Sequence, residues 1–167
     1  YSIDSVEAPV LLPFGALCAD VDMPQAHERG NFLPQAVDLA IKSLDARGNG
    51  FFLMVEGSQI DYQGHGNNTQ GVVNEMLDFD RAIKIALDFA ERDGETLVVI
   101  TADHETGGMT IMNGSYSDKT IEAQFNTEGH TGTMVPIYSF GPQADKFTGI
   151  MENTKIPLLI KETLELQ

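Results

Sequence analysis

The chain has 167 residues, 42% of them hydrophobic, which is enough to bury the core of an ordinary globular domain, and we expect a single domain over residues 1–167. The formal net charge of −15 argues against a nucleic-acid-binding protein, whose contact surface would be basic. No apolar run reaches the roughly 18 residues of a membrane span, no signal peptide is recognisable at the N-terminus, and the single cysteine, Cys18, excludes an internal disulfide.

An amphipathic helix is the first clear element, predicted from Leu33 to Arg47. Apolar residues recur there with the period of one helical face, Pro34 suits the first turn, and Gly48 suits the end. The next element, Phe51–Val55, is an uninterrupted run of five apolar residues. Such a run predicts a strand that is buried on both faces inside a parallel sheet.

Candidate metal ligands follow this strand at once: Glu56 at its end, then Asp61 and His65. Asp61 and His65 are four residues apart, so one helical turn would place both on the same face. Carboxylate oxygen together with imidazole nitrogen suits zinc, whereas an all-oxygen set would suit magnesium or calcium. A solvated loop with ordinary polar residues is the alternative interpretation, which this stretch alone does not exclude.

A long helix is predicted next, from a cap at Asn68 or Thr69 to about Arg92. Its buried stripe is formed by regularly spaced apolar residues. Its acidic residues, among them Glu75 and Asp78, are interpreted as a charged face in contact with solvent.

A second buried strand is predicted at Leu97–Ile100, and Asp103 and His104 follow it. Strand, helix and strand form the right-handed crossover unit of a parallel sheet, which brings the ends of both strands to the same edge. We therefore expect Asp103 and His104 to approach Asp61 and His65.

The remaining candidate ligand, His130, precedes its strand, Met134–Phe140, instead of following it. A parallel strand would place His130 at the opposite edge of the sheet, and an antiparallel strand would place it among the other ligands. We predict the antiparallel arrangement. Asp61, His65 and His130 then form a three-ligand zinc site with an open position, typical of catalytic zinc. The pair after the second strand would serve a second metal nearby.

Two smaller elements complete the pattern. Asn113-Gly114 is a turn signal and predicts a small hairpin within residues 109–126. A last helix is predicted after a cap at Asn153 or Thr154, with Pro157 in its first turn.

Three motifs allow a more specific inference. They are VEGSQIDYQGH at Val55–His65, TADHETGG at Thr101–Gly108 and HTG at His130–Gly132. Their residues, order and spacing resemble the alkaline phosphatases over nearly the whole chain. The resemblance implies an α/β fold, a three-layer αβα partial domain with a mostly parallel sheet and one antiparallel strand. It also implies that the chain is the C-terminal part of the catalytic domain.

By this resemblance, the chain carries most of the zinc and magnesium ligands of a hydrolase that dephosphorylates phosphate monoesters. The implied ligands are Asp61, His65 and His130 for the first zinc, Asp103 and His104 for the second zinc, and Glu56 for the magnesium. Tyr62 and Thr106 follow such ligands closely and are expected to lie near the bound phosphate, either lining the wall of the site or tuning phosphate release.

The family's serine nucleophile lies in an Asp-Ser-Ala motif that has no counterpart here, since the one Asp-Ser pair, Asp4-Ser5, continues differently. The family's upstream metal ligands and its phosphate-binding arginine also lack counterparts, and the chain begins at Tyr1. We therefore expect a fragment that contains no catalytic nucleophile and is inactive alone. The resemblance implies a parent enzyme that is periplasmic, secreted or attached to the cell surface.

Two other functions stay open on the sequence. A related metal-dependent hydrolase, such as a phosphodiesterase or a sulfatase, would lack the magnesium-type carboxylate that Glu56 represents. A non-catalytic metal-binding or interaction module would explain the missing nucleophile. Only 25 residues separate His104 from His130, where larger family members carry an inserted subdomain, so the expectation of a homodimer is also left open.

Overall fold

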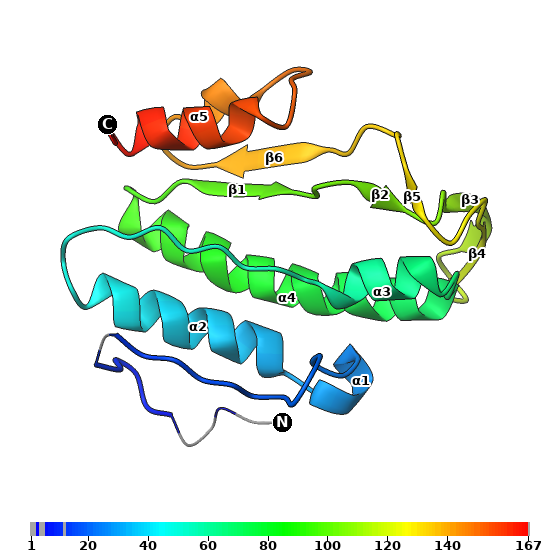
Figure 1. Ribbon diagram of the computed structural model, residues 1–167, viewed down its shortest axis with the longest axis horizontal. Coiled ribbons are helices and arrows are strands. Elements are labelled where there is room, and N and C mark those ends of the chain that lie inside the picture. The colour runs from blue at the N-terminus through cyan, green and yellow to red at the C-terminus, as the bar shows by residue number, and fades with distance from the viewer. Residues whose placement is uncertain (1–2, 4–5, 12, 167) are drawn as a thin grey trace. The chain divides into compact units, whose positions relative to one another are not determined.

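The computed structural model describes residues 3, 6–11 and 13–166, and the Asp4-Ser5 pair lies outside the described residues. Figure 1 labels the helices and strands in chain order. None of the helices in the described part of the chain is both long enough and apolar enough to cross a membrane.

The contacts within the chain divide it into two units that alternate along the sequence. The first unit consists of Tyr1–Ala86 and Thr106–His130, and the second consists of Leu87–Glu105 and Thr131–Gln167. Each unit is described by itself below.

Helices dominate the first unit. They are α1 (Ala26–Arg29), α2 (Phe32–Asp45), α3 (Gln59–His65) and α4 (Thr69–Asp93), the last of which continues into the second unit. The two long helices, α2 and α4, confirm the predicted ones to within two residues at each end. Val37 and Ile41 of α2 and Ala90 of α4 are among the buried apolar residues, as the periodicity predicts.

Of the two residues predicted to cap α4, Asn68 and Thr69, the structure uses Asn68. Its side-chain oxygen accepts the backbone N–H of Gly71 at 3.0 Å, and its side-chain nitrogen donates to Oε1 of Gln63 at 2.9 Å. One side chain thus satisfies a free N–H of the first helical turn and ties α4 to α3.

The interpretation of Glu75 and Asp78 as solvent-facing is wrong. Their exposed fractions are 2% and 0%, and both contact Arg29, which is itself 7% exposed. One nitrogen of Arg29, Nη2, lies 2.6 Å from Glu75 and 2.5 Å from Asp78. Glu75 also accepts the backbone N–H of Ala26 at 2.7 Å. The helical pattern does not reveal this burial because the cation that neutralises the carboxylates comes from α1, far away in the sequence.

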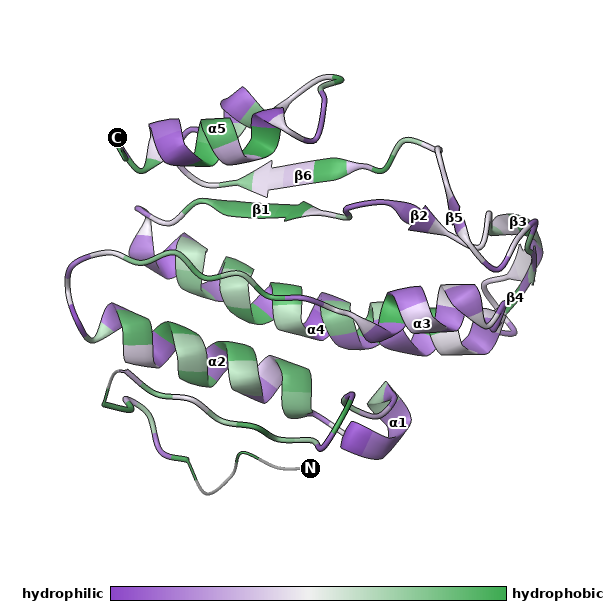
Figure 2. Ribbon diagram, in the orientation of Figure 1, coloured by the Kyte–Doolittle hydropathy of each residue, from purple (hydrophilic) through white to green (hydrophobic). Residues whose placement is uncertain are grey.

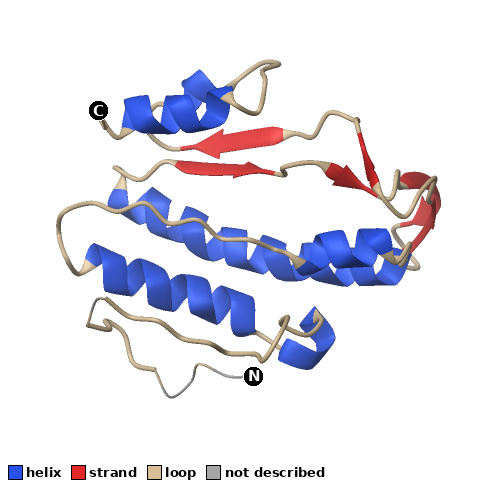
Figure 3. Cartoon of the chain, in the orientation of Figure 1, coloured by secondary structure: helices blue, strands red, loops and turns tan. Residues whose placement is uncertain are grey.

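The predicted strand Phe51–Val55 is not a strand in the structure. The segment runs between α2 and α3 as an extended loop, drawn in tan in Figure 3. Its side chains alternate in exposure, with Phe52 at 61% and Met54 at 75%. An extended segment becomes a strand only when its backbone groups pair with a neighbour, and no ladder among the described residues includes this one.

The hairpin within residues 109–126 is present as β3 (Thr110–Ser115) and β4 (Thr120–Gln124), but its predicted turn is misplaced. Asn113-Gly114 lies inside β3, and the chain turns at residues 116–119. Oγ of Ser115 accepts the N–H of Asp118 at 3.2 Å and so stabilises that turn. Gly114 is needed for close strand contact, since an added Cβ would lie 2.9 Å from the carbonyl oxygen of Thr120.

The second unit is built on β1 (Val98–Thr101) and β6 (Ile137–Phe140), which pair antiparallel from Val98↔Phe140 to Thr101↔Ile137. This pairing confirms the predicted antiparallel strand after His130, and Figure 2 shows the hydrophobic character of β1. Two short helical segments follow, η1 (Ala144–Phe147) and α5 (Lys155–Thr163). Phe147, at 1% exposure, and Leu159, at 9%, belong to the core of this unit.

The expected parallel ladders are not among the strand pairs of the described residues. The ladders whose registers are resolved, β1 with β6 and β3 with β4, are antiparallel. A third pair joins the two-residue strands β2 (Glu105–Thr106) and β5 (His130–Thr131). A parallel ladder requires β1 to have a parallel neighbour, and Phe51–Val55, the predicted neighbour, pairs with no strand of the described residues.

Replacing Arg29 by methionine should lower the free energy of unfolding by about 3–5 kcal/mol. The reason is that, among the described residues, buried Glu75 then loses its ion-pair partner and buried Asp78 keeps Arg81, which is half exposed. Lys42→Met is the matched control, because its ion pair with Asp38 on α2 is exposed and contributes only about 0.5 kcal/mol. Urea denaturation of both variants measures the difference, and equal losses would contradict the stabilising role of the buried ion pairs.

Candidate metal centre

Helix α3 presents Asp61 and His65 on one face, as their spacing predicts. The helix covers Gln59–His65, so the two side chains lie one turn apart. Nε2 of His65 is 3.3 Å from Oδ2 of Asp61. The side chains are 39% and 40% exposed, so both are accessible to an ion from solvent.

A short loop brings His130 to these residues. The backbone N–H groups of Asn126 and Thr127 donate to the carbonyl of Gly107 at 2.9 and 3.2 Å. The N–H of Gly107 donates in turn to the carbonyl of Gly129 at 2.9 Å. These bonds fix the backbone on both sides of the loop and so determine the position of His130, the next residue.

Glycines allow the segments to approach this closely. Gly107 has φ +89°, and an added Cβ there would lie 2.7 Å from the ring of Phe125 and 2.9 Å from the carbonyl oxygen of Gly64. An added Cβ at Gly64 would lie 3.0 Å from both Cβ and Cγ2 of Thr106. A side chain at either position would push α3 away from the segment that leads to His130.

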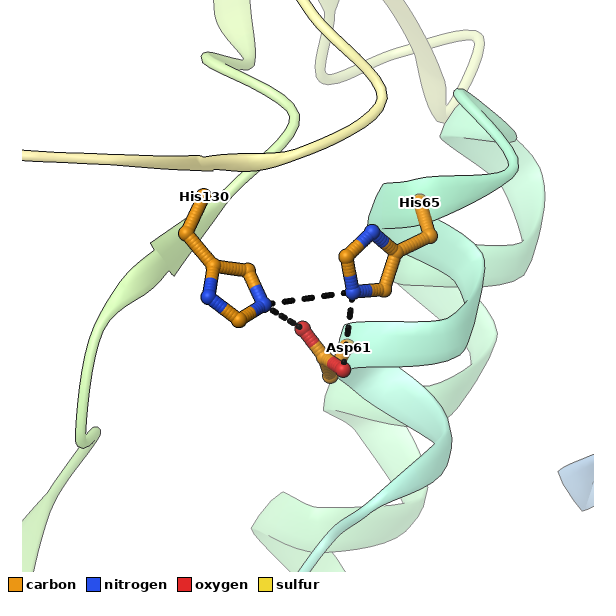
Figure 4. Close-up of side chains that lie close together, drawn as sticks. All are labelled: Asp61, His65 and His130. Atoms are coloured by element: carbon orange, nitrogen blue, oxygen red, sulfur yellow. Dashed lines mark hydrogen bonds and ion pairs between the residues drawn. The ribbon is translucent and has the colours of Figure 1, made fainter.

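Asp61, His65 and His130 point toward a common centre (Figure 4). Nε2 of His65 lies 3.2 Å from Nε2 of His130, which lies 3.7 Å from Oδ1 of Asp61. A tetrahedral zinc ion with bonds of about 2.0–2.2 Å holds its ligand atoms about 3.3–3.5 Å apart. The donor types and their separations therefore fit a zinc ion, with a fourth position left for a ligand from solvent.

Two further contacts orient the ligands. Nδ1 of His65 donates a hydrogen bond to the backbone carbonyl of Glu128, because a carbonyl only accepts, and this bond turns Nε2 toward Asp61 and His130. Oγ1 of Thr106 donates to Oδ1 of Asp61. The contact between His65 and the carbonyl of Glu128 cannot be recognised in the sequence, because every residue has a backbone carbonyl. The sequence analysis does name Thr106, but as a residue near the bound phosphate and not as a partner of Asp61.

Tyr62 lies in an acidic environment. The negative charge of Asp22 and a hydrogen bond to its carboxylate, together with the charges of Asp61 and Glu56, raise the pKa of the Tyr62 hydroxyl. The hydroxyl therefore stays protonated at neutral pH and acts as a donor. The same carboxylates make this part of the first unit attractive to cations.

The other predicted ligands lie outside the group of three. Glu56 is exposed and lies in the extended segment before α3, close enough for its charge to act on Tyr62. Asp103 and His104 directly follow β1 in the second unit, where Nε2 of His104 is 3.2 Å from Oδ2 of Asp103. Asp103 is 86% exposed. Two ligands alone do not complete a metal site.

Comparison with known proteins gives a consistent result. The family model for alkaline phosphatase matches residues 3–123 and 112–166. Alkaline phosphatase 3 of Bacillus subtilis (strain 168) is 33% identical, and the match covers 89% of this chain and 48% of the relative. The alkaline phosphatase of Escherichia coli (strain K12) is 32% identical, with 86% of this chain and 34% of the relative covered. The chain thus spans about half or less of the length of these curated relatives.

Solved structures resemble the chain as well. The alkaline phosphatase from the Antarctic bacterium TAB5 has 44% identity and a TM-score of 0.80, over 87% of this chain and 44% of that one. A mutant of the TAB5 enzyme with Mg bound in its M3 site has 43% identity and a TM-score of 0.83, over 90% of this chain and 46% of that one. These likenesses confirm the expected fold class, a partial alkaline-phosphatase-like domain of mixed helices and strands.

Gly107→Ala should lower the free energy of unfolding by about 1–3 kcal/mol, because an alanine is strained at positive φ and its Cβ collides with Phe125 and Gly64. Gly132→Ala is the control, since an added Cβ there meets nothing within 4 Å. Urea denaturation measures both. Equal stability of the two variants would show that the close approach at Gly107 is not required.

Proposed function

Because the chain belongs to the alkaline phosphatase family, we propose that it is part of a metal-dependent phosphomonoester hydrolase and supplies one of its zinc sites. The observation that carries the proposal is the convergence of Asp61, His65 and His130 at separations that suit tetrahedral zinc. The chain covers only 48% of the B. subtilis relative, so the reaction of the whole enzyme is also part of the proposal.

In this proposal the ligands divide into three sets. Asp61, His65 and His130 hold the first zinc ion. Asp103 and His104 contribute to the second, and Glu56 contributes to a magnesium site, both completed by residues outside this chain. Bound zinc would supply Lewis-acid stabilisation of the negative charge on phosphate oxygens, and it would reverse the local charge of a protein whose net charge is −15.

The chain's own residues hold this site in place. The hydrogen bond to Glu128 fixes the His65 ring, and the loop bonds at Gly107 fix His130. Protonated Tyr62, 48% exposed beside Asp61, is positioned to donate a hydrogen bond to a phosphate oxygen once its bond to Asp22 is exchanged. We therefore propose, as the sequence predicts, that Tyr62 lies near the bound phosphate.

The nucleophile is the missing part. No Asp-Ser-Ala motif occurs in the sequence, so we propose that the isolated chain does not hydrolyse phosphate esters by a covalent serine route. The parent enzyme is proposed to be periplasmic, secreted or attached to the cell surface, and a phosphate monoester is the proposed substrate. We propose a homodimer for the parent enzyme and not for the isolated chain.

Zinc titration of the metal-stripped chain by calorimetry should give about one tight equivalent. His65→Ala and His130→Ala should each lower the affinity by more than about 100-fold, because each removes one of three protein ligands. His27→Ala is the control, since His27 lies on α1 outside the group of three. Tight binding that survives both ligand substitutions would contradict the proposed site.

Aryl phosphate added to the zinc-loaded chain should not be hydrolysed above the rate given by free zinc. In the proposed site the chain supplies three ligands for one zinc ion, but its sequence has no serine in the nucleophile motif. Release of the aryl alcohol is followed by absorbance over many turnovers. Sustained hydrolysis that disappears in His130→Ala would show that the chain is catalytically sufficient and would overturn the proposed inactivity.

A further inference from the structure

Asn67 lies two residues beyond His65 and ends α3. Its backbone has φ +50°, in the left-handed region that asparagine tolerates better than most residues. Its N–H donates to the carbonyl of Gly64 at 3.0 Å, and the N–H of Asn68 donates to that of Gln63 at 3.0 Å. These two bonds form a Schellman motif, which satisfies the last carbonyls of the helix. A glycine would serve this backbone role at least as well.

The side chain of Asn67 makes a second connection. Its amide nitrogen donates to two carbonyls, that of Gly64 at 3.1 Å and that of Thr127 at 2.8 Å. The nitrogen and not the oxygen faces these carbonyls, because a carbonyl only accepts. Gly64 belongs to α3, whereas Thr127 belongs to the loop that leads to His130. One side chain therefore joins the end of the helix to that loop.

Two adjacent carbonyls attach the loop to the end of α3. The amide of Asn67 donates to the carbonyl of Thr127, and Nδ1 of His65 donates to that of Glu128. Both acceptors belong to the three residues that precede His130. Of the two donors, Asn67 is the one that is not itself a candidate ligand. Its bond to the loop is therefore independent of how the His65 ring turns.

We propose that Asn67 is a positioning residue for the first metal site: its side-chain amide holds the loop, and with it His130, against the helix that carries the other two ligands. This inference rests on the proposed function, because it assumes that the group of three binds zinc. A loop that is already held in place has less conformational freedom to lose when the ion binds, so the amide raises the affinity for zinc. One hydrogen bond typically contributes about 5-fold to such an equilibrium.

Asn67→Gly separates the side chain from the backbone role. Glycine adopts φ +50° without strain, so this variant keeps the end of the helix and removes the amide. If the end of the helix were the whole role of Asn67, the variant would bind zinc as tightly as the wild type. We expect instead an affinity lower by about 5-fold, measured by competition with a chelator. The matched control is Lys119→Gly, at φ +53° in the turn between β3 and β4, which should leave the zinc affinity unchanged.

Hydrogen exchange provides a second measurement, made on the metal-stripped chain. The N–H groups of Gly107 and Gly129 are hydrogen-bonded within the loop, so their exchange followed by NMR reports its opening. We expect Asn67→Gly to exchange about 5-fold faster at these amides and at the wild-type rate in the ladder of β3 and β4. Asn67→Asp should act in the same direction, because aspartate tolerates positive φ but its carboxylate has no N–H to donate.

The outcomes distinguish this inference from the proposed function. Wild-type zinc affinity in Asn67→Gly would overturn the role of Asn67 and leave the metal site intact. Lower affinity without faster exchange in the loop, or an equal loss in Lys119→Gly, would also overturn it, because the effect would not come from the amide. A folded wild-type chain that binds no zinc would contradict the metal site itself and, with it, the role of Asn67.

Discussion

The candidate site depends on the close approach of two backbone segments, one at the end of α3 and one that leads from Gly107 to Gly129. Gly64 and Gly107 permit this approach because neither position has room for a Cβ. The hydrogen bond between the N–H of Gly107 and the carbonyl of Gly129 closes it. His65 and His130 are 65 residues apart in sequence, and this approach brings their Nε2 atoms to 3.2 Å from each other.

The acidic residues of the first unit serve two different purposes. Glu75 and Asp78 are buried and are neutralised by Arg29, so they stabilise the packing of α1 on α4. Asp61 is 40% exposed and faces two imidazoles, and none of the ion pairs found among the described residues joins it to an arginine or a lysine. A carboxylate kept in this way beside two imidazole rings is suited to a cation from solvent. The net charge of the chain does not distinguish structural carboxylates from candidate ligands, whereas the exposed fraction of each side chain does.

Much of the site could be predicted from sequence because its signals are local. The four-residue spacing of Asp61 and His65 fixes their common helix face. The antiparallel direction of the strand after His130 was predicted because only that direction places His130 beside the other two ligands, and β6 has it. The strand Phe51–Val55 could not be predicted correctly, because a ladder depends on a partner elsewhere. The burial of Glu75 likewise depends on its ion pair with Arg29, and no sequence pattern links a residue of α1 to one of α4. Propensity placed the hairpin turn at Asn113-Gly114, but close strand contact uses that glycine instead.

The most direct test of the central claim is a crystal structure of the chain with zinc, analysed by anomalous scattering at the zinc edge. The account predicts one dominant peak, bonded at about 2.0–2.2 Å to Nε2 of His65, Nε2 of His130 and a carboxylate oxygen of Asp61. Zinc bound instead at Asp103 and His104, with the group of three empty, would contradict it.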